Sequence, residues 1–290
     1  MMKKQIQEFI QQAWESSDGE RFPGPQPVSI ERRHFPEFKK RAYVVCEKTD
    51  GVRHLLVSLE LDGKRAAFLV NRAFETVTVS TMIPRGTILD GELVSIKGPV
   101  ASRPVFLIHD AVCVKGTDVR REPLTKRLDA ARALLKSVVR SVKDPFEIRV
   151  KHMTTWPGPL PNLETLPWET DGLVFTPVDE PVRSGTHETL FKWKPRDRIT
   201  IDFALFRGTD LYVQDRGVPY KEAALYGRNI RRDLPDGTIV ECGYGDLGWS
   251  VEKIRTDKTH PNNRRTYFRT LVNIRENIQL DEFWALYKAM

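Results

Sequence analysis

A lysine stands beside an Asp-Gly turn and an arginine in the stretch Cys46–Leu56, which reads CEKTDGVRHLL. Lys48 ends an apolar run, and Arg53 follows the turn at Asp50 and Gly51. Such a lysine is either a solvated residue at a turn or a nucleophile, because an amine that has lost its proton attacks electrophilic centres. The stretch alone leaves both interpretations open.

Three pairs of like charges, each spaced two residues apart, accompany this lysine. Side chains two apart share one face of a strand. Like charges on a buried face are costly unless a counter-ion, a metal or a ligand compensates them. A strand with one solvated face shows the same alternation, so no single pair is specific. The pairs are Asp90 with Glu92, Glu169 with Asp171, and Lys192 with Lys194.

Together these charges suit the attack of a lysine on the α-phosphate of a nucleotide. Lys192 and Lys194 supply a positive field, which lowers the pKa of a nearby lysine and holds a phosphate chain. The carboxylates bind the divalent metal that screens the phosphates. The predicted chemistry is covalent nucleotidyl transfer.

The composition favours an anionic partner. The chain carries 46 Lys and Arg against 39 Asp and Glu, a formal net charge of +7, which suits nucleic acid or nucleotides but also a mildly basic soluble protein. Three separated cysteines predict neither a disulfide framework nor a zinc site. We see no signal peptide and no apolar span of about 20 residues, so we expect an intracellular protein with no membrane partner.

Turn signals divide the chain into short strands and a few helices. We expect an amphipathic helix over 6–14. Antiparallel strands should follow, joined by hairpins at 50–51, 62–63 and 84–86. Past residue 198 the number and length of the strands suit a small barrel such as an OB-fold, although periodicity does not distinguish a barrel from a sandwich.

These residues resemble the motifs of the covalent nucleotidyltransferases, the superfamily of DNA ligases, RNA ligases and mRNA capping guanylyltransferases. Its signature K-x-D-G-x-R is matched by Lys48–Arg53. The forms DGLVFTP and KWKP and the upstream FPGPQPVS are more similar to capping enzymes than to ligases. Further matches follow in family order: DGELV at 90–94, FLIHDAV at 106–112, TDGLVFTP at 170–177, FKWKP at 191–195, TIDF at 200–203 and RTDK at 255–258.

The resemblance implies a role for each matching residue. Lys48 is the expected nucleophile, which forms a lysyl-N-GMP phosphoamide. Arg53 and Glu92 resemble the ribose contacts, and Asp171 resembles the carboxylate that engages the metal and the lysine. The remaining matches are Lys192 and Lys194 as the α-phosphate and guanine-side lysines, Asp202 as a carboxylate that assists phosphate chemistry, and Arg255, Asp257 and Lys258 as the motif that closes over the β and γ phosphates.

The chain departs from the family where a base-stacking phenylalanine is usual. His109 stands before Asp110, in place of the Phe of the family's FDAV element. A histidine ring stacks with a smaller face, so it would weaken base binding or make it depend on pH; the other interpretation is a histidine satisfied within its strand. Phe106 is a less favoured substitute. We also assign Lys151 to guanine recognition.

The resemblance implies an α+β fold in three parts. A nucleotidyltransferase domain of the ligase type, with ATP-grasp-like antiparallel sheets and helices, is expected over 1–198. An OB-fold β-barrel is expected over 199–270. The C-terminal helix, 271–290, should pack back on the first domain.

The predicted enzyme is an mRNA guanylyltransferase, an RNA 5′-guanylyltransferase of the nucleotidyltransferase class. It transfers GMP from GTP to the 5′-diphosphate end of RNA, with Mg²⁺ or Mn²⁺. The alternatives are an ATP-dependent polynucleotide ligase and a non-catalytic RNA-binding subunit of a capping complex. Function alone predicts a nuclear location in a cell. Candidate partners are an RNA triphosphatase, a cap methyltransferase and the RNA polymerase II tail.

Overall fold

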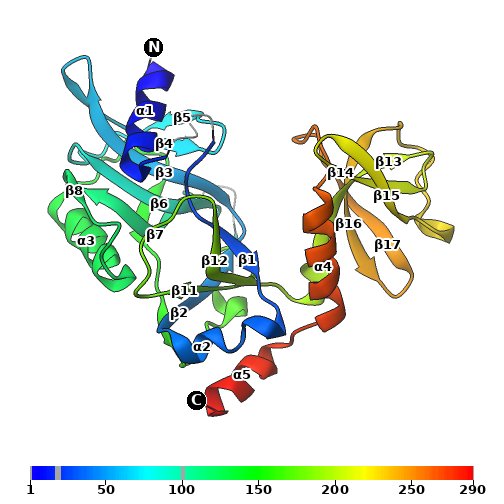
Figure 1. The fold of residues 1–290 in the computed structure, drawn as a ribbon. Helices are drawn as coiled ribbons and strands as arrows, with labels where there is room; N and C mark the ends of the chain where they lie inside the picture. The colour runs from blue at the N-terminus through cyan, green and yellow to red at the C-terminus, as the bar shows by residue number, and fades with distance from the viewer. Residues whose placement is uncertain (1, 17–20, 99–101, 290) are drawn as a thin grey trace. The chain divides into compact units, whose positions relative to one another are not determined.

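The structure is a computed structural model that describes residues 2–16, 21–98 and 102–289. The chain divides into two compact units. Unit 1 comprises Met1–Val28 and Pro36–Lys192, and unit 2 comprises Ser29–Phe35 and Trp193–Met290. Figure 1 labels the elements of both. The domain boundaries expected from the sequence, at residues 198 and 270, stay predictions.

The larger sheet of unit 1 has seven strands, in the order β5-β4-β3-β6-β7-β8, with β9 parallel to β7. The hairpin predicted at 62–63 joins β3 to β4 and is confirmed, because both residues have the positive φ of a tight two-residue turn. The strands are β3 (Val52–Leu61), β4 (Lys64–Asn71), β5 (Thr76–Thr78), β6 (Thr87–Val94), β7 (Val105–Val114), β8 (Thr117–Asp118) and β9 (Glu147–Val150).

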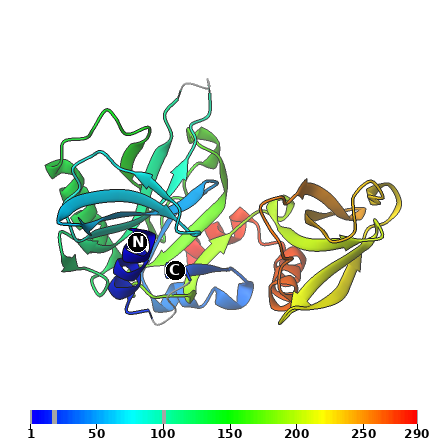
Figure 2. The ribbon, with the colours of Figure 1, turned by 90° about the horizontal axis from the view of Figure 1, so that it is seen from above.

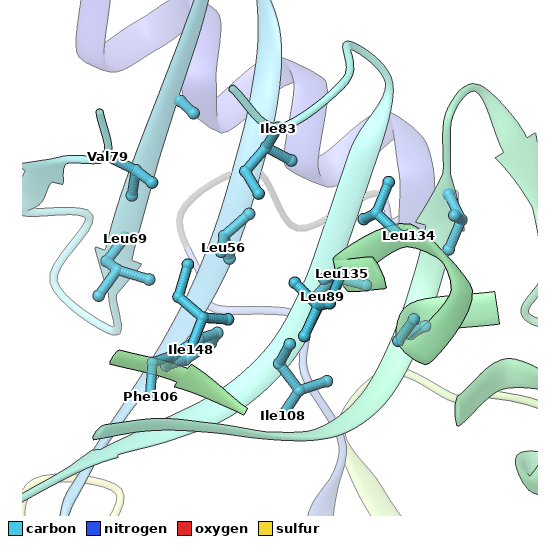
Figure 3. Packing of buried hydrophobic residues seen from close by; sticks show 14 of the residues in the cluster. Leu56, Leu69, Val79, Ile83, Leu89, Phe106, Ile108, Leu134, Leu135 and Ile148 are labelled. Carbon is cyan, nitrogen blue, oxygen red and sulfur yellow. The ribbon is translucent and has the colours of Figure 1, made fainter. Parts of the chain in front are cut away.

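Helices cover both faces of this sheet. On β3, Leu56 packs in a cluster that includes Leu134 of helix α3, as Figure 3 shows. The adjacent Leu55 packs in a second cluster with Ile10 of helix α1. Successive strand residues point to opposite sides, so α1 and α3 lie on opposite faces, and the predicted first helix is confirmed. The helices of unit 1 are α1 (Met2–Trp14), α2 (Glu37–Lys40), α3 (Leu124–Ser137) and the short η2 (Leu163–Thr165).

The second sheet of unit 1 carries the lysine of the CEKTDG stretch. Its five strands run in the order β1-β12-β11-β2-β10. The ring of Phe38 on α2 lies within 6.0 Å, between ring centroids, of four aromatic rings of this sheet, those of Tyr43, Trp156, Phe175 and Phe191. The strands are β1 (Gln26–Ser29), β2 (Tyr43–Thr49), β10 (Thr154–Trp156), β11 (Thr170–Pro177) and β12 (Thr186–Trp193).

Two of the three predicted hairpins are wrong. β2 and β3 belong to different sheets, so the Asp50-Gly51 turn is a crossing between the sheets. Gly51 is required there because a Cβ atom would lie 2.5 Å from the carbonyl oxygen of Leu93. At 84–86 the chain passes from β5 to β6, which are not neighbours in their sheet. Turn residues mark where a strand ends, but they do not select its partner.

Unit 2 is built on one antiparallel sheet, in the order β15-β14-β13-β16-β17. The α+β class is confirmed with one correction: among the described strands β15 and β17 do not pair, so the sheet is open and the predicted barrel does not close. The sequence shows how many strands there are but not whether the edges meet. The strands are β13 (Thr200–Phe206), β14 (Asp210–Asp215), β15 (Val218–Ala224), β16 (Thr238–Gly245) and β17 (Gly248–Ile254).

Helix α4 covers one face of this open sheet, where Figure 2 shows it beside the strands. Tyr267 and Ile274 of α4 are buried in one cluster with Phe203 of β13. No helix in the described parts of the chain is long and apolar enough to span a membrane. The helices of unit 2 are α4 (Arg264–Glu276), α5 (Leu280–Ala289), η1 (Arg32–His34), η3 (Arg196–Arg198) and η4 (Gly227–Asn229).

The segment Ser29–Phe35 belongs to unit 2 because it contacts α5. Arg32 donates hydrogen bonds of 2.9 and 2.8 Å to the carboxylate of Glu282. The rings of Phe35 and Phe283 lie 6.0 Å apart, between centroids. The last helix therefore packs on a short piece of the N-terminal sequence within its own unit.

Candidate active site

A bulge in a neighbouring strand holds Lys48 against a carboxylate. β11 pairs with β2 so that Gly172 lies opposite Lys48 and Thr170 opposite Thr49, which leaves Asp171 as an extra residue. Bulges re-aim side chains and are frequent beside active sites. Asp171 Oδ1 lies 2.8 Å from Lys48 Nζ, and the two side chains are 13% and 24% exposed. The lysine is therefore fixed, yet a ligand can reach it.

The predicted basic pair lies at the end of β12. This strand is the neighbour of β11, which carries Asp171, so the sheet brings Lys192 two strands from β2. Phe191 and Trp193 are buried, whereas Lys192 is half-buried, as the alternation of a strand requires. Lys194, also half-buried, follows the end of β12 and belongs to unit 2.

Arg53 is fixed by a buried carboxylate, Asp90, which the motif comparison left without a role. The guanidinium donates to both carboxylate oxygens of Asp90, at 3.0 and 2.6 Å, and to the carbonyl oxygen of Pro25 at 2.6 Å. The ring centroid of Phe22 lies 5.3 Å from the guanidinium carbon. The only signal in the sequence was the spacing of Asp90 two residues before Glu92. Three groups, the Asp90 carboxylate, the Pro25 carbonyl and the Phe22 ring, thus keep Arg53 in one orientation.

The charges around Asp90 depend on burial and on each other. Burial alone raises the pKa of Asp90, which is 1% exposed, but Arg53 and His109 outweigh burial and hold this pKa below its usual range. Burial opposes the charge of Arg53, yet Asp90 raises the pKa of this guanidinium. His109 Nε2 lies 3.5 Å from Asp90 Oδ1, and burial lowers the pKa of the imidazole despite that carboxylate. At neutral pH we expect a charged Arg53–Asp90 pair beside a neutral His109.

A buried chain of polar contacts links Lys151 to Glu92. Lys151 Nζ donates to Thr49 Oγ1 at 3.2 Å and lies 3.6 Å from Glu47 Oε1. The hydroxyl of Thr49 in turn donates to Glu92 Oε2 at 2.5 Å. Trp168 Nε1 donates to Glu47 at 3.3 Å. Glu92 therefore faces Thr49 and not Arg53, and the predicted guanine contact, Lys151, is already held by a carboxylate.

Four of the residues predicted in unit 2, Asp202, Arg255, Asp257 and Lys258, form one cluster. The buried carboxylate of Asp202 accepts a hydrogen bond from Arg255 at 2.9 Å and pairs with Lys258. Arg255 also donates to Asp257, at 2.9 and 2.8 Å, and to Glu241 at 3.2 Å. Glu241 lies opposite Asp202 in the β13–β16 register and matches no motif, so the sequence gave no signal for it. Arg255 is surrounded by three carboxylates, which hold its guanidinium in place.

The donors near Lys48 fit a metal that arrives with a nucleotide. Within the described residues, no group of three or more His, Cys, Asp or Glu side chains could hold a metal ion by itself. Asp171 offers a carboxylate beside Lys48. Mg²⁺ in nucleotide sites is commonly held by one or two carboxylates together with phosphate oxygens and water. One protein carboxylate, Asp171, beside Lys48 fits the protein's part of that pattern.

In unit 1 a lysine is held by a carboxylate, and in unit 2 an arginine and a lysine lie together. These features are typical of a nucleotidyltransferase built from two units. The sequence comparisons narrow this class. The family profile "mRNA capping enzyme, catalytic domain" matches residues 1–196, and "mRNA capping enzyme, C-terminal domain" matches 197–284. The chain belongs to the mRNA capping enzyme family.

The similar proteins described next align with most of this chain and with most of their own length. The mRNA-capping enzyme subunit alpha of Neurospora crassa is 30% identical, over 93% of this chain and 85% of that protein. Its counterparts in Yarrowia lipolytica and Schizosaccharomyces pombe are each 33% identical, over 89% and 90% of this chain and 78% of either protein. Among solved structures, mycobacterial DNA ligase D complexed with ATP and MES aligns over 81% of this chain and 95% of that chain, with 13% identity and a TM-score of 0.46.

Proposed function

We propose that this chain is an RNA 5′-guanylyltransferase, which moves GMP from GTP to the 5′-diphosphate end of RNA. The observation that carries the proposal is the 2.8 Å contact between Lys48 Nζ and Asp171 Oδ1 in a member of the capping enzyme family. The contact places a half-buried amine where a carboxylate orients it. It explains why this chain needs a bulge at Asp171.

The reaction has two displacements at one phosphorus atom. In the first, the unprotonated amine of Lys48 attacks the α-phosphorus of GTP; a P–N bond forms, the bond to the bridging oxygen breaks, and pyrophosphate leaves. In the second, an oxygen of the terminal phosphate of the RNA attacks the same phosphorus, and the P–N bond breaks. The lysine nitrogen loses one proton as the P–N bond forms and regains one as that bond breaks, so the products are GpppRNA and free Lys48. Asp171 orients the amine and takes up its hydrogen bond again at the end.

Other predicted residues bind and orient the nucleotide in this proposal. Arg53, fixed by Asp90, meets the ribose together with Glu92. The His109 ring stacks on the base, and Lys151 contacts the guanine. Lys192 and Lys194 contact the α-phosphate and the guanine side of the nucleotide. Asp171 would hold Mg²⁺ or Mn²⁺, which would neutralise phosphate charge.

The Asp202 cluster of unit 2 acts on the β and γ phosphates. Arg255 and Lys258 exchange carboxylate partners for phosphate oxygens, and Asp257 keeps the guanidinium fork aligned. Because these cations stabilise the departing pyrophosphate, Arg255→Ala should slow formation of the lysyl-GMP adduct far more than transfer from it. Normal adduct formation with failed transfer would contradict the assigned roles.

The test is covalent labelling of the full chain. Incubation with α-labelled GTP and Mg²⁺, followed by a denaturing gel, should label the protein, and diphosphate-ended RNA should then remove the label as GpppRNA. Lys48→Ala should take no label. Lys64→Ala, which removes an exposed lysine at the start of β4, is the matched control and should label normally. Label from ATP in place of GTP would indicate a polynucleotide ligase, and no label from either would indicate a non-catalytic RNA-binding subunit.

The cellular setting follows from the reaction alone. A guanylyltransferase needs RNA with a diphosphate end, so an RNA triphosphatase must act before it and a cap methyltransferase after it. A nuclear location and recruitment by the RNA polymerase II tail are proposed on the same ground. Localisation of a tagged full chain, and its co-purification with a triphosphatase, test these points.

A further inference from the structure

Unit 2 exposes two aromatic rings that flank an arginine outside the Asp202 cluster. The guanidinium carbon of Arg264 lies 4.7 Å from the ring centroid of Tyr220 and 5.3 Å from that of Phe268. Tyr220 comes from the edge strand β15, and Phe268 follows Arg264 by one turn of α4. The two aromatic side chains are 36% and 46% exposed. None of the steps proposed above uses these three residues, which we call the Tyr220 platform.

Hydrogen bonds and ring packing hold the Tyr220 platform in place. Glu222 lies two residues from Tyr220 on β15, and its carboxylate accepts a hydrogen bond from Arg264 Nε at 2.5 Å. The carbonyl oxygen of Glu222 accepts a second hydrogen bond from the hydroxyl of Tyr267 at 3.1 Å. Tyr267 is 5% exposed, and its ring centroid lies 5.2 Å from that of Phe268. The exposed rings are therefore pre-positioned and lose little conformational freedom when a ligand binds.

Positive charge borders the Tyr220 platform. Helix α4 contains four arginines and one acidic residue, Glu276. Throughout the described parts of the chain, neither Arg265 nor Arg269 pairs with a carboxylate. Within the platform, Glu222 is neutralised by Arg264. The surface therefore combines flat rings with cations that are available to phosphates.

We propose that the Tyr220 platform stacks unpaired bases of the RNA that receives the cap. Single-stranded nucleic acid is bound by aromatic rings that meet successive bases beside cations that follow the backbone, and arginine planes stack as well. An apolar protein partner would leave the cations of α4 without counter-charges. The inference rests on the proposed function for its choice of RNA, and it places an RNA contact on unit 2.

The test measures RNA binding directly, without chemistry. The probe is a single-stranded RNA of twelve or so nucleotides with a 5′ diphosphate and a 3′ fluorophore, and binding to the full chain is followed by fluorescence anisotropy. Removing both rings, by Tyr220→Ala with Phe268→Ala, should weaken binding at least about tenfold, since each stacked base contributes on the order of one such factor. Tyr220→Phe with Phe268→Tyr keeps both rings and should bind as the unaltered chain does.

Two controls separate stacking from charge and from general loss of surface. Tyr226→Ala removes an exposed tyrosine, and Arg232→Gln an exposed arginine, elsewhere on unit 2; both should bind RNA nearly normally. An abasic strand with the same phosphates should bind weakly to the unaltered chain and should not distinguish it from the double alanine variant. The proposal is overturned if the double alanine variant binds the RNA normally, if Tyr226→Ala loses as much, or if the loss is equal on the abasic strand.

Adduct formation distinguishes this proposal from the proposed function. The double alanine variant should form the lysyl-GMP adduct at the normal rate. Its defect should be in transfer, which should require a higher RNA concentration. If the unaltered chain binds RNA through the platform but forms no adduct with GTP, the proposed function fails while the RNA site stands. If it forms the adduct and the ring variants do not alter RNA binding, the RNA site fails alone.

Discussion

Asp90→Asn tests the buried ion pair that positions Arg53. In the folded chain Asp90 is 1% exposed and accepts two hydrogen bonds from Arg53, whose side chain is 11% exposed. The positive charge of Arg72 also acts on this carboxylate. The asparagine keeps the shape and one acceptor but leaves a buried guanidinium without a counter-charge. The change should therefore destabilise unit 1 much more than an equivalent change at the surface.

The expected loss can be scaled from the burial of the pair. Removing one partner of a buried ion pair typically costs about 3–5 kcal/mol, and the retained acceptor places Asp90→Asn near the lower end. For a unit of this size each kcal/mol lowers the melting temperature by about 2–4 °C, which gives a fall of about 6–12 °C. The same variant should raise the KM for GTP, because Arg53 loses its fixed orientation.

Scanning calorimetry of the full chain provides the assay, and Asp233→Asn provides a matched control. Asp233 accepts two hydrogen bonds from Arg231, at 2.9 and 2.8 Å, but it is 62% exposed, so its loss should not shift the transition measurably. Arg53→Gln combined with Asp90→Asn should cost less than the sum of the single changes. A loss below about 1 kcal/mol for Asp90→Asn, or additive single and double variants, would refute the reasoning.

Three further changes test other contacts. Because burial lowers the pKa of His109 from 6.5, the unfolded chain takes up a proton at this histidine before the folded chain does, and the free energy of unfolding should fall as the pH drops below about 6.5. His109→Phe should reduce that fall, measured by denaturant titrations at pH 7 and pH 5. An unchanged fall would contradict the prediction. Gly24→Val should lower the free energy of unfolding by about 1–3 kcal/mol, and with it the melting temperature, since an added Cβ atom would lie 2.6 Å from Phe22 and 2.7 Å from Arg53. An unshifted transition would show that the segment can move aside. Asp202→Asn should slow adduct formation about tenfold or more while transfer from purified adduct changes little, because Arg255 and Lys258 lose the buried carboxylate that positions both cations before the phosphates bind. Equal effects on the two steps in single-turnover assays would argue against it.

The sequence predicts the chemistry of the site better than its geometry. Motif spacing brought together Lys48 and Asp171, and the structure joins them at 2.8 Å. It could not show that Asp171 is the extra residue of a bulge, because a bulge depends on the register of two distant strands. For the same reason Arg53 was matched with Glu92, which lies opposite it on β6, whereas the buried partner is Asp90.

The fold also contains features that follow from neighbouring residues and features that depend on pairing between distant strands. The helix α1 and the turn at Asp62-Gly63 follow from local patterns, and both were predicted. The crossing at Asp50-Gly51 and the open edge at β15 depend on which strands meet, and pairing is decided by burial across whole sheets. Glu241 lies in the Asp202 cluster because β16 pairs with β13, and no local sequence pattern indicates this pairing.

The most direct measurement of the central claim is mass spectrometry of the full chain after incubation with GTP and Mg²⁺. We expect a single added GMP, mapped by peptide analysis to Lys48, and none after incubation with ATP. Lys48→Ala should carry no nucleotide, while Lys64→Ala should carry the normal amount. A nucleotide on another lysine, or an adduct formed from ATP and not from GTP, would contradict the account.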